Sequence, residues 1–267
     1  MLFSCLISIL VSIVFSVTQP EYTLEKELKS RADFFTVDQL GFVYLIQNTE
    51  IKKLDLSQNN EKSFSSLLSG KITGVDVADP FKTLLFYKDF NKIIFLDKNL
   101  SELTSPIVLD DLGYYNVLSV CQSVNGGFWI FDQSLSSLIF IDKNLNTIKK
   151  SSSLSELIGE NLDQKQVFML EKNDYIYLGI SGEGILLFDS YGTYIKTFPL
   201  LNTGRFQVNN EIISYSKDEE LYFYNTDSFT EKKMPLPIHS YNQVMIVNKK
   251  LFIQTEGKIL IYKLNNF

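Results

Sequence analysis

Short runs of strand-forming residues recur along the chain, and each run ends in a polar residue followed by a turn. The segment "KIIFLDKNL" (92–100) returns almost unchanged as "SLIFIDKNL" (137–145). Four or five residues drawn mainly from Ile, Leu, Phe and Tyr suit the pleated surface of a β-sheet. Copies of the pattern occupy 50–59, 92–101, 138–146, 184–193, 220–228 and 258–266. Each copy is therefore expected to form one strand.

The copies follow one another at a nearly constant interval. The residues that end them lie 36 to 47 positions apart, and they are Asp55, Asp97, Asp142, Asp189, Asn225 and Lys263. A repeat of this length that is built from short strands is typical of a β-propeller blade, in which each repeat forms one four-stranded sheet.

Other strand-forming runs fill the interval between copies. Second strands are predicted at 41–46, 82–88, 127–132, 175–180, 211–216 and 250–255. First strands are predicted at 33–38, 72–79, 117–123, 166–172, 205–210 and 242–248. A more polar fourth strand follows several copies, as in "TYIKTFPLL", and turn formers such as "DQLG" and "DPFK" separate first from second strands.

The sequence therefore predicts an all-β, six-bladed β-propeller with four-stranded antiparallel blades, as a single domain over 19–267. The blades are expected at approximately 33–66, 71–109, 116–155, 165–201, 204–237 and 241–267. The last repeat stops after its third strand, and 22–30 resembles the fourth strands, so this N-terminal strand is expected to close the last blade. Seven blades, a β-helix and a two-sheet sandwich are alternatives. The stretch 151–163 resembles a short helix, with Ser153 and Glu156 as its capping box.

The first residues form a separate apolar segment. Residues 2–17 are an unbroken run of apolar and small residues, and no charged side chain precedes Glu21. The run is shorter than the ~20 residues that a membrane-spanning helix needs. We interpret residues 1–18 as a cleavable signal peptide, with an uncleaved anchor as the alternative. After cleavage the chain is expected to have no stable membrane span.

Composition and charge narrow the range of partners. The 267 residues, 45% of them hydrophobic, suffice for a sizeable core. A formal net charge of −6 and scattered lysines argue against nucleic acid as a partner. Cleavage of the signal peptide would remove Cys5, so Cys121 has no disulfide partner and is expected to be a small buried hydrophobe in "NVLSVCQS".

Candidate catalytic and metal-binding residues are few. His239 is the only histidine, and no G-x-S-x-G motif indicates a nucleophile, so no catalytic residue is assigned. On the predicted first strands only Asp76, Glu171 and Gln207 could reach a cation on the axis, which is a sparse oxygen set for a hard cation. No metal site and no cofactor are assigned. Trp129 is expected to pack on a sheet face, with a sugar-binding platform as the alternative.

Polar and aromatic residues gather in the predicted loops at one end of the propeller. The loops between second and third strands and the links between blades open at that end, which usually carries the function of a propeller. The densest set comes from blades two and three, and it consists of Lys88, Asp89, Asn91, Asp110, Asp111, Tyr114, Asp132 and Gln133. We predict that this set forms a binding face. The alternative for each residue is a role in turn formation alone.

Several of these segments resemble known propellers. Through "VDQLGFVYL" and "IKKLDL" the chain loosely resembles NHL-type and TolB-like six-bladed propellers. More specifically, "GVDVADPFKTLLFYKDFNKIIFLDKNL", "LDDLGYYNV" and "GFWIFDQ" resemble a family of exported propeller proteins of Gram-negative bacteria. No activity is established for that family, so the resemblance implies a fold and an exported location, periplasmic or secreted, rather than a reaction.

We therefore expect a non-catalytic, periplasmic protein-interaction scaffold whose partner is an envelope protein. The narrower expectation is an accessory of an outer-membrane assembly or secretion machine, associated with the outer membrane. A metal-dependent lactonase or sugar-acting hydrolase of the six-bladed type is the first alternative, and a carbohydrate-binding propeller is the second.

Overall fold

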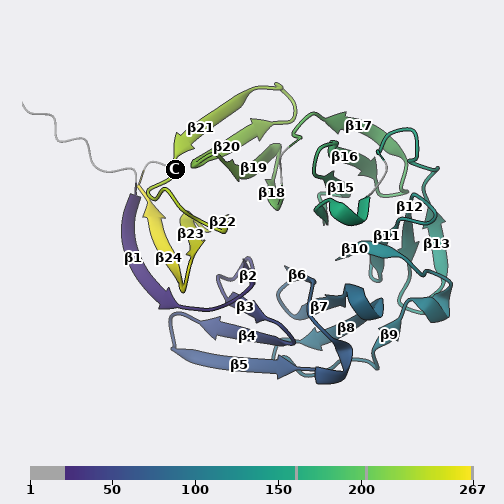
Figure 1. Cartoon of the computed structure of the whole chain (residues 1–267), viewed down its shortest axis with the longest axis horizontal. Coiled ribbons are helices and arrows are strands. Elements are labelled where there is room, and N and C mark those ends of the chain that lie inside the picture. The colour runs from purple at the N-terminus through teal and green to yellow at the C-terminus, as the bar shows by residue number, and fades with distance from the viewer. Residues whose placement is uncertain (1–21, 160–161, 202–203, 266–267) are drawn as a thin grey trace, which may run out of the picture.

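The computed structural model describes residues 22–159, 162–201 and 204–265. In this part of the chain, six four-stranded antiparallel sheets stand around a common axis (Figure 1). Each sheet is one blade, so the all-β, six-bladed propeller predicted from the repeat is confirmed. The predicted signal peptide, residues 1–18, lies outside the described residues.

The strands of blades one to three follow one another in chain order from the axis outward. Blade one consists of β2 (Phe34–Val37), β3 (Val43–Gln47), β4 (Glu50–Asp55) and β5 (Asn60–Ser65). Blade two consists of β6 (Gly74–Asp79), β7 (Lys82–Tyr87), β8 (Lys92–Asp97) and β9 (Ile107–Val108). Blade three consists of β10 (Val117–Gln122), β11 (Phe128–Asp132), β12 (Ser137–Ile141) and β13 (Thr147–Lys150).

Blades four and five repeat this order, whereas blade six takes one strand from the other end of the described chain. Blade four consists of β14 (Val167–Lys172), β15 (Tyr175–Ile180), β16 (Gly184–Asp189) and β17 (Tyr194–Phe198). Blade five consists of β18 (Phe206–Asn209), β19 (Ile212–Lys217), β20 (Glu220–Asn225) and β21 (Glu231–Pro235). Blade six consists of β22 (Gln243–Val247), β23 (Lys250–Thr255), β24 (Lys258–Leu264) and, as its outermost strand, β1 (Tyr22–Lys29).

The repeated aspartates end the third strands by binding the backbone of the turn that follows. Oδ1 of Asp97 accepts hydrogen bonds from the N–H groups of Asn99 and Ser101 at 2.8 and 2.9 Å. Asp142 and Asp189 make the same turn. A short side chain that satisfies its own backbone competes with further strand pairing, so the strand stops there.

Lysines on some fourth strands donate hydrogen bonds to the neighbouring blade. Nζ of Lys149 on β13 donates to the carbonyl oxygen of Ser190 in blade four at 2.6 Å. Nζ of Lys26 on β1 donates to the carbonyl oxygen of Leu56 in blade one at 3.1 Å. In both pairs the acceptor lies in the turn that ends the third strand, so the repeat also provides a point of attachment for its neighbour.

Apolar side chains fill the space between neighbouring blades. Between blades three and four, for example, Phe131 and Phe140 pack in one cluster with Leu178 and Phe188. Equivalent clusters join the other neighbouring blades. Each such side chain contributes about 1.5–3 kcal/mol when it is fully buried. The core is therefore a ring of interfaces around the axis.

In the described connections, helical structure is limited to short 3₁₀ turns. The 3₁₀ helices are η1 (Leu67–Ser69), η2 (Lys88–Phe90), η3 (Asp110–Leu112) and η4 (Leu162–Gln164). Within the described residues, no helix has the length and apolar character needed to cross a membrane.

The helix predicted for 151–163 is wrong over its described first half. Residues 151–159 are irregular apart from a turn at 155–157, where the N–H groups of Leu157 and Ile158 donate to the carbonyl oxygen of Leu154 at 2.8 and 3.1 Å. Leu154 and Ile158 are buried in the cluster between blades three and four. Their helix-like spacing reflects this docking of an irregular segment rather than a continuous helix.

Candidate functional site

The first strands of the six blades surround a channel along the axis. The channel has a volume of about 1140 Å³. Its wall includes residues from both ends of the first strands. Phe34 begins β2 and Gln39 follows that strand, and Arg205 and Asn210 flank β18. The channel therefore extends along the whole length of these strands.

Two carboxylates of the first strands join neighbouring blades. Oδ2 of Asp76 in blade two accepts a hydrogen bond from the N–H of Gln122 in blade three at 2.7 Å. The carboxylate of Glu171 in blade four accepts from Nε1 of Trp129 at 2.8 Å and from the N–H of Val124 at 3.2 Å, both in blade three. These carboxylates are structural acceptors for blade three, which lies between them.

Two glutamines form equivalent bridges further around the ring. Gln243 of β22 accepts from the N–H of Phe35 at 3.2 Å and donates to its carbonyl oxygen at 2.8 Å. Gln207 of β18 binds the N–H and carbonyl oxygen of Ile246 at 2.7 and 3.0 Å. All three polar side chains considered for a cation thus bond to a neighbouring blade. Among the described residues, no group of three or more His, Cys, Asp or Glu side chains is placed to hold a metal ion.

Arg205 differs from the other polar residues of the channel. Its guanidinium lies 4.2 Å from the ring centroid of Phe34 in blade one and 5.5 Å from that of Phe168 in blade four. Burial lowers the pKa of Arg205 to about 10, so the side chain stays charged at neutral pH. Arg205 is not among the site residues predicted from the sequence. Two features of the sequence could have indicated it. Arg205 is a cation at the start of a predicted first strand, and the only other arginine in the sequence is Arg31.

The structure brings together three residues of the predicted binding face. Nδ2 of Asn91 donates to Oδ1 of Asp110 and to the carbonyl oxygen of Tyr114. Asn91 is buried and has a left-handed backbone with a φ of 45°. Its carbonyl oxygen accepts from the N–H of Leu109 at 2.9 Å. This network fixes the connection from blade two to blade three.

The other residues of that predicted set are distributed over neighbouring loops. Lys88 lines the channel, Asp89 is exposed in η2, and Asp111 is exposed in η3. Asp132 and Gln133 begin the turn between β11 and β12, where Asp132 is buried and accepts from a backbone N–H of the same turn. The carboxylates of this set that remain accessible are therefore those of η2 and η3.

Exposed apolar side chains lie beside these carboxylates. We call the surface formed by η1, η2, η3 and the β11–β12 turn (133–136) the loop face, because all four connections lie at the end where the first strands begin. On this face Leu67 and Leu68 are 82% and 88% exposed, and Phe90 is 53% exposed. The ring of Phe90 lies so close to Gly70 that a Cβ there would come within 2.5 Å of it. The ring of Phe90 therefore rests against the backbone that directly follows η1, which carries Leu67 and Leu68.

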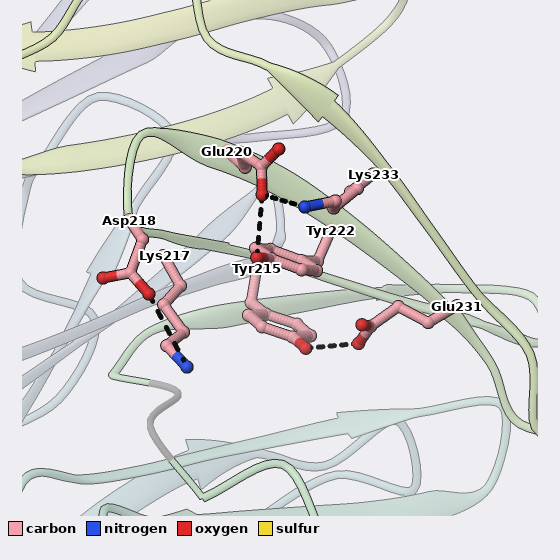
Figure 2. A network of polar contacts seen from close by, with 7 residues as sticks. All are labelled: Tyr215, Lys217, Asp218, Glu220, Tyr222, Glu231 and Lys233. Carbon is pink, nitrogen blue, oxygen red and sulfur yellow. Dashed lines mark hydrogen bonds and ion pairs between the residues drawn. The ribbon is translucent and has the colours of Figure 1, made fainter.

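A polar network crosses the outer strands of blade five (Figure 2). The rings of Tyr215 and Tyr222 are stacked with their centroids 5.1 Å apart. The hydroxyl of Tyr215 donates to Glu231 at 2.5 Å, and Glu220 binds both the hydroxyl of Tyr222 at 3.0 Å and Nζ of Lys233 at 2.6 Å. Burial, and then Glu231, raises the pKa of Tyr215. Because the tyrosine rings pack toward blade four, the network stabilises that interface.

The remaining chemically reactive side chains are either buried or exposed outside the channel. Cys121 is buried, as predicted, and its pKa is raised well above the ordinary value by burial and by nearby carboxylates. Trp129 is buried with its Nε1 bound to Glu171, which agrees with the predicted packing role. The side chain of His239 is 92% exposed, and its Nδ1 lies 2.9 Å from Glu219 Oε2.

Comparisons with known proteins identify the fold. No family model matches the chain, and no curated protein matches it in sequence. A streptogramin B lyase structure is 14% identical, with a TM-score of 0.61 over 92% of this chain and 88% of that chain. Virginiamycin B lyase from Staphylococcus aureus is 13% identical, with a TM-score of 0.63 over 91% of this chain and 100% of that chain. A chain of the mitotic checkpoint complex is 8% identical, with a TM-score of 0.67 over 98% of both chains. At these identities the likeness shows a β-propeller and nothing narrower.

Proposed function

We propose that this protein is a non-catalytic interaction scaffold that binds a protein partner through its loop face. In the fuller form of the proposal, residues 1–18 are a cleaved signal peptide, β1 closes the ring of blades, and the protein acts in the periplasm. The partner then belongs to an outer-membrane assembly or secretion machine, as the resemblance to exported propellers suggests.

The observation that carries the proposal is the apolar patch of Leu67, Leu68 and Phe90. Large apolar side chains that gather on an exposed surface are typical of protein-binding sites. Here the patch is well defined, because Phe90 rests on Gly70 and η1 directly precedes that glycine.

The carboxylates beside the patch indicate the charge of the partner. Asp89, Asp110 and Asp111 lie in η2 and η3, and Asp110 is oriented by its bond from Asn91. Charges at the rim of an interface guide association and select among partners more than they add affinity. A partner with a basic rim around an apolar centre fits this surface.

The structural neighbours are compatible with either a scaffold or an enzyme. One is a chain of the mitotic checkpoint complex. Another is virginiamycin B lyase, which is catalytically inactive as an H270A variant. We favour the scaffold, because the single histidine of this chain is exposed and its Nδ1 faces Glu219 rather than the channel.

The test is partner capture with matched variants. A carboxy-terminally tagged chain would be purified from cross-linked cell envelopes and compared with Leu68→Ser/Phe90→Ser on the loop face. Phe81→Ser is the control, because Phe81 is 64% exposed in the β6–β7 turn at the opposite end of the propeller. We expect one stoichiometric envelope protein with the parent and the control, and its loss with the double variant at an unchanged Tm. Equal capture by both variants would contradict the proposal.

A separate measurement tests the location. Fractionation and N-terminal sequencing of the mature protein are expected to give a periplasmic chain that begins near residue 19. A membrane-bound chain that retains its first residues would show that this segment is an uncleaved anchor and not a signal peptide.

A further inference from the structure

Arg205 occupies a distinctive position in the channel. It immediately precedes β18 of blade five, and its guanidinium contacts aromatic rings of blades one and four. The side chain therefore extends over the channel at the end where the first strands begin. A guanidinium that lies on the face of an aromatic ring leaves its N–H groups free at its edge.

The positive charge of Arg205 has no counterpart in the described part of the chain. Its guanidinium forms no ion pair and no hydrogen bond with any described residue, and burial alone lowers its pKa. A desolvated charge without a partner is costly, and two aromatic contacts recover only a part of that cost. Lys165 also lines the channel, but its charge is neutralised by Glu183.

The surroundings of the guanidinium are mainly apolar. A small side cavity that adjoins the channel is lined by Arg205 together with Val75, Phe168 and Met245. Thr36 lines the same cavity with a hydroxyl group. This side cavity has a volume of only about 50 Å³, so a ligand would lie in the adjoining channel, which Arg205 also lines. There it would meet the cation beside apolar side chains and neutral polar groups, a combination that is usual in small-molecule sites.

From this geometry we infer that Arg205 binds the carboxylate of a small monoanionic ligand whose apolar body lies against Phe34 and Phe168. The edge of the guanidinium would donate two parallel hydrogen bonds to the carboxylate oxygens, as in other arginine–carboxylate pairs. Such an ion pair would supply the missing counter-charge within the channel.

The charge of the site favours a carboxylate over a phosphate. A single guanidinium matches one negative charge, whereas a phosphate carries nearly two at neutral pH. Asp33, Asp76 and Glu171 line the same channel and would repel a second negative charge. The inference is independent of the proposed scaffold function, because the loop-face patch and Arg205 share no residue.

The inference can be tested by calorimetric titration with benzoate, an aromatic monoanion. Benzamide is the neutral analogue of similar shape, and inorganic phosphate is the competing anion. We expect benzoate to bind with a Kd below about 1 mM, and benzamide and phosphate to bind at least tenfold more weakly. Absence of benzoate binding, or equal binding of benzamide, would overturn the inference.

Substitution of the arginine assigns the binding to the site. Arg205→Met is expected to weaken benzoate binding by roughly 10- to 100-fold, because the charge-assisted hydrogen bonds are lost. The control is Arg31→Met, which removes the other arginine of the chain, an exposed one, and should leave binding unchanged. Equal benzoate binding by the Arg205→Met protein would overturn the inference.

Two further measurements distinguish a loss of ligand binding from a loss of folding. Without ligand, the Tm of Arg205→Met should equal or exceed that of the parent, because a partly buried charge without an ion-pair partner among the described residues is removed. Arg205→Lys keeps the charge but loses the two-pronged geometry, so we expect binding between that of the parent and that of Arg205→Met. A fall in Tm for both variants would show that Arg205 supports the fold, and the ligand assignment would then be wrong.

Discussion

Asp76 and Glu171 line the same channel as Arg205, yet their roles in the molecule differ. Each carboxylate accepts hydrogen bonds from blade three and so connects that blade to its neighbours. Arg205 forms no ion pair or hydrogen bond with a described residue, and its guanidinium lies over the rings of Phe34 and Phe168. A polar side chain in the channel of a propeller is therefore no sign of function by itself, whereas one whose hydrogen-bonding capacity stays unused points to a ligand.

The comparison also explains how the wall of the channel can be polar and stable. The first strands of neighbouring blades do not pair with each other through their backbones. Carboxylate and amide side chains on these strands make the hydrogen bonds between blades instead. Gln243, for example, binds both the N–H and the carbonyl oxygen of Phe35 in the next blade. The polar groups near the axis thus hold the blades in register, while the apolar clusters further out supply most of the burial.

The largest loss of stability is expected for Glu171→Ala. This change leaves Nε1–H of buried Trp129 and the N–H of Val124 without their acceptor, so the free energy of unfolding should fall by about 2–4 kcal/mol. Urea unfolding measures the loss. Asp111→Ala, which removes an exposed carboxylate in η3, should change stability by less than about 0.5 kcal/mol. An equal decrease in the free energy of unfolding for the two variants would show that Glu171 is no more important for stability than an exposed carboxylate.

A smaller loss is expected for Gln243→Ala. The side chain makes two hydrogen bonds to Phe35 that join blade six to blade one, and a neutral pair of this kind contributes about 1–2 kcal/mol. The same urea experiment applies, with Gln58→Ala in an exposed turn as the control. A stability equal to that of the control would show that blades six and one are held together by their apolar cluster alone.

The sequence predicted the blades because their pattern is local and repeated. Strand-forming runs, turn residues and the aspartate at each strand end all act within a few residues, so they can be recognised without a structure. The position of Arg205 depends on Phe34, which is distant in sequence and becomes a neighbour only when the ring of blades forms. The stacked pair Tyr215 and Tyr222 likewise requires the register of two strands.

The binding-face prediction illustrates the same limit for a candidate site. Its residues were grouped because their loops should open at one end, which is where the structure places η2 and η3. Sequence alone did not separate Asn91 and Asp132, which are buried, from exposed Asp89. Asn91 binds the carbonyl oxygen of Tyr114 in the connection to blade three, and Asp132 binds a backbone N–H of its own turn. The apolar residues Leu67 and Leu68 were passed over, because exposure of a leucine follows from tertiary packing and not from its neighbours in sequence.

A loss of about 1 kcal/mol or less is expected for Lys149→Met. The ammonium group donates to Ser190 at 2.6 Å and lies 5.1 Å from the ring centroid of Phe140, and methionine keeps the packing of the stem but not the hydrogen bond. Thermal unfolding of this variant should be compared with Lys150→Met, the exposed neighbour on the same strand. A larger loss than that of Gln243→Ala would show that the outer attachment of the blades outweighs the axial one.

The most subtle difference should appear in the titration of the aspartates. Burial raises the pKa of Asp76 above the ordinary 3.8, against the opposing hydrogen bonds from the N–H groups of Ala78 and Gln122. The backbone hydrogen bond from Ser101 lowers the pKa of Asp97. As pH rises above 3.8, Asp76 loses its proton in the unfolded chain before it does so in the folded protein. The contribution of Asp76 to stability, which is fully present below pH 3.8, is therefore lost as pH rises through the raised pKa of the folded state.

Asp97 has the opposite pH dependence. Its contribution is present above 3.8 and is lost as pH falls through the lowered pKa of the folded state. Carbon-detected NMR titration of the side-chain carboxyl groups measures both midpoints, and Asp76→Asn and Asp97→Asn assign the two signals. We expect the Asp76 midpoint to lie above that of Asp97. The reverse order would mean that the hydrogen bonds from Ala78 and Gln122 outweigh burial, and Asp76 would then stabilise the junction of blades two and three mainly in its ionised form, as Asp97 stabilises its turn.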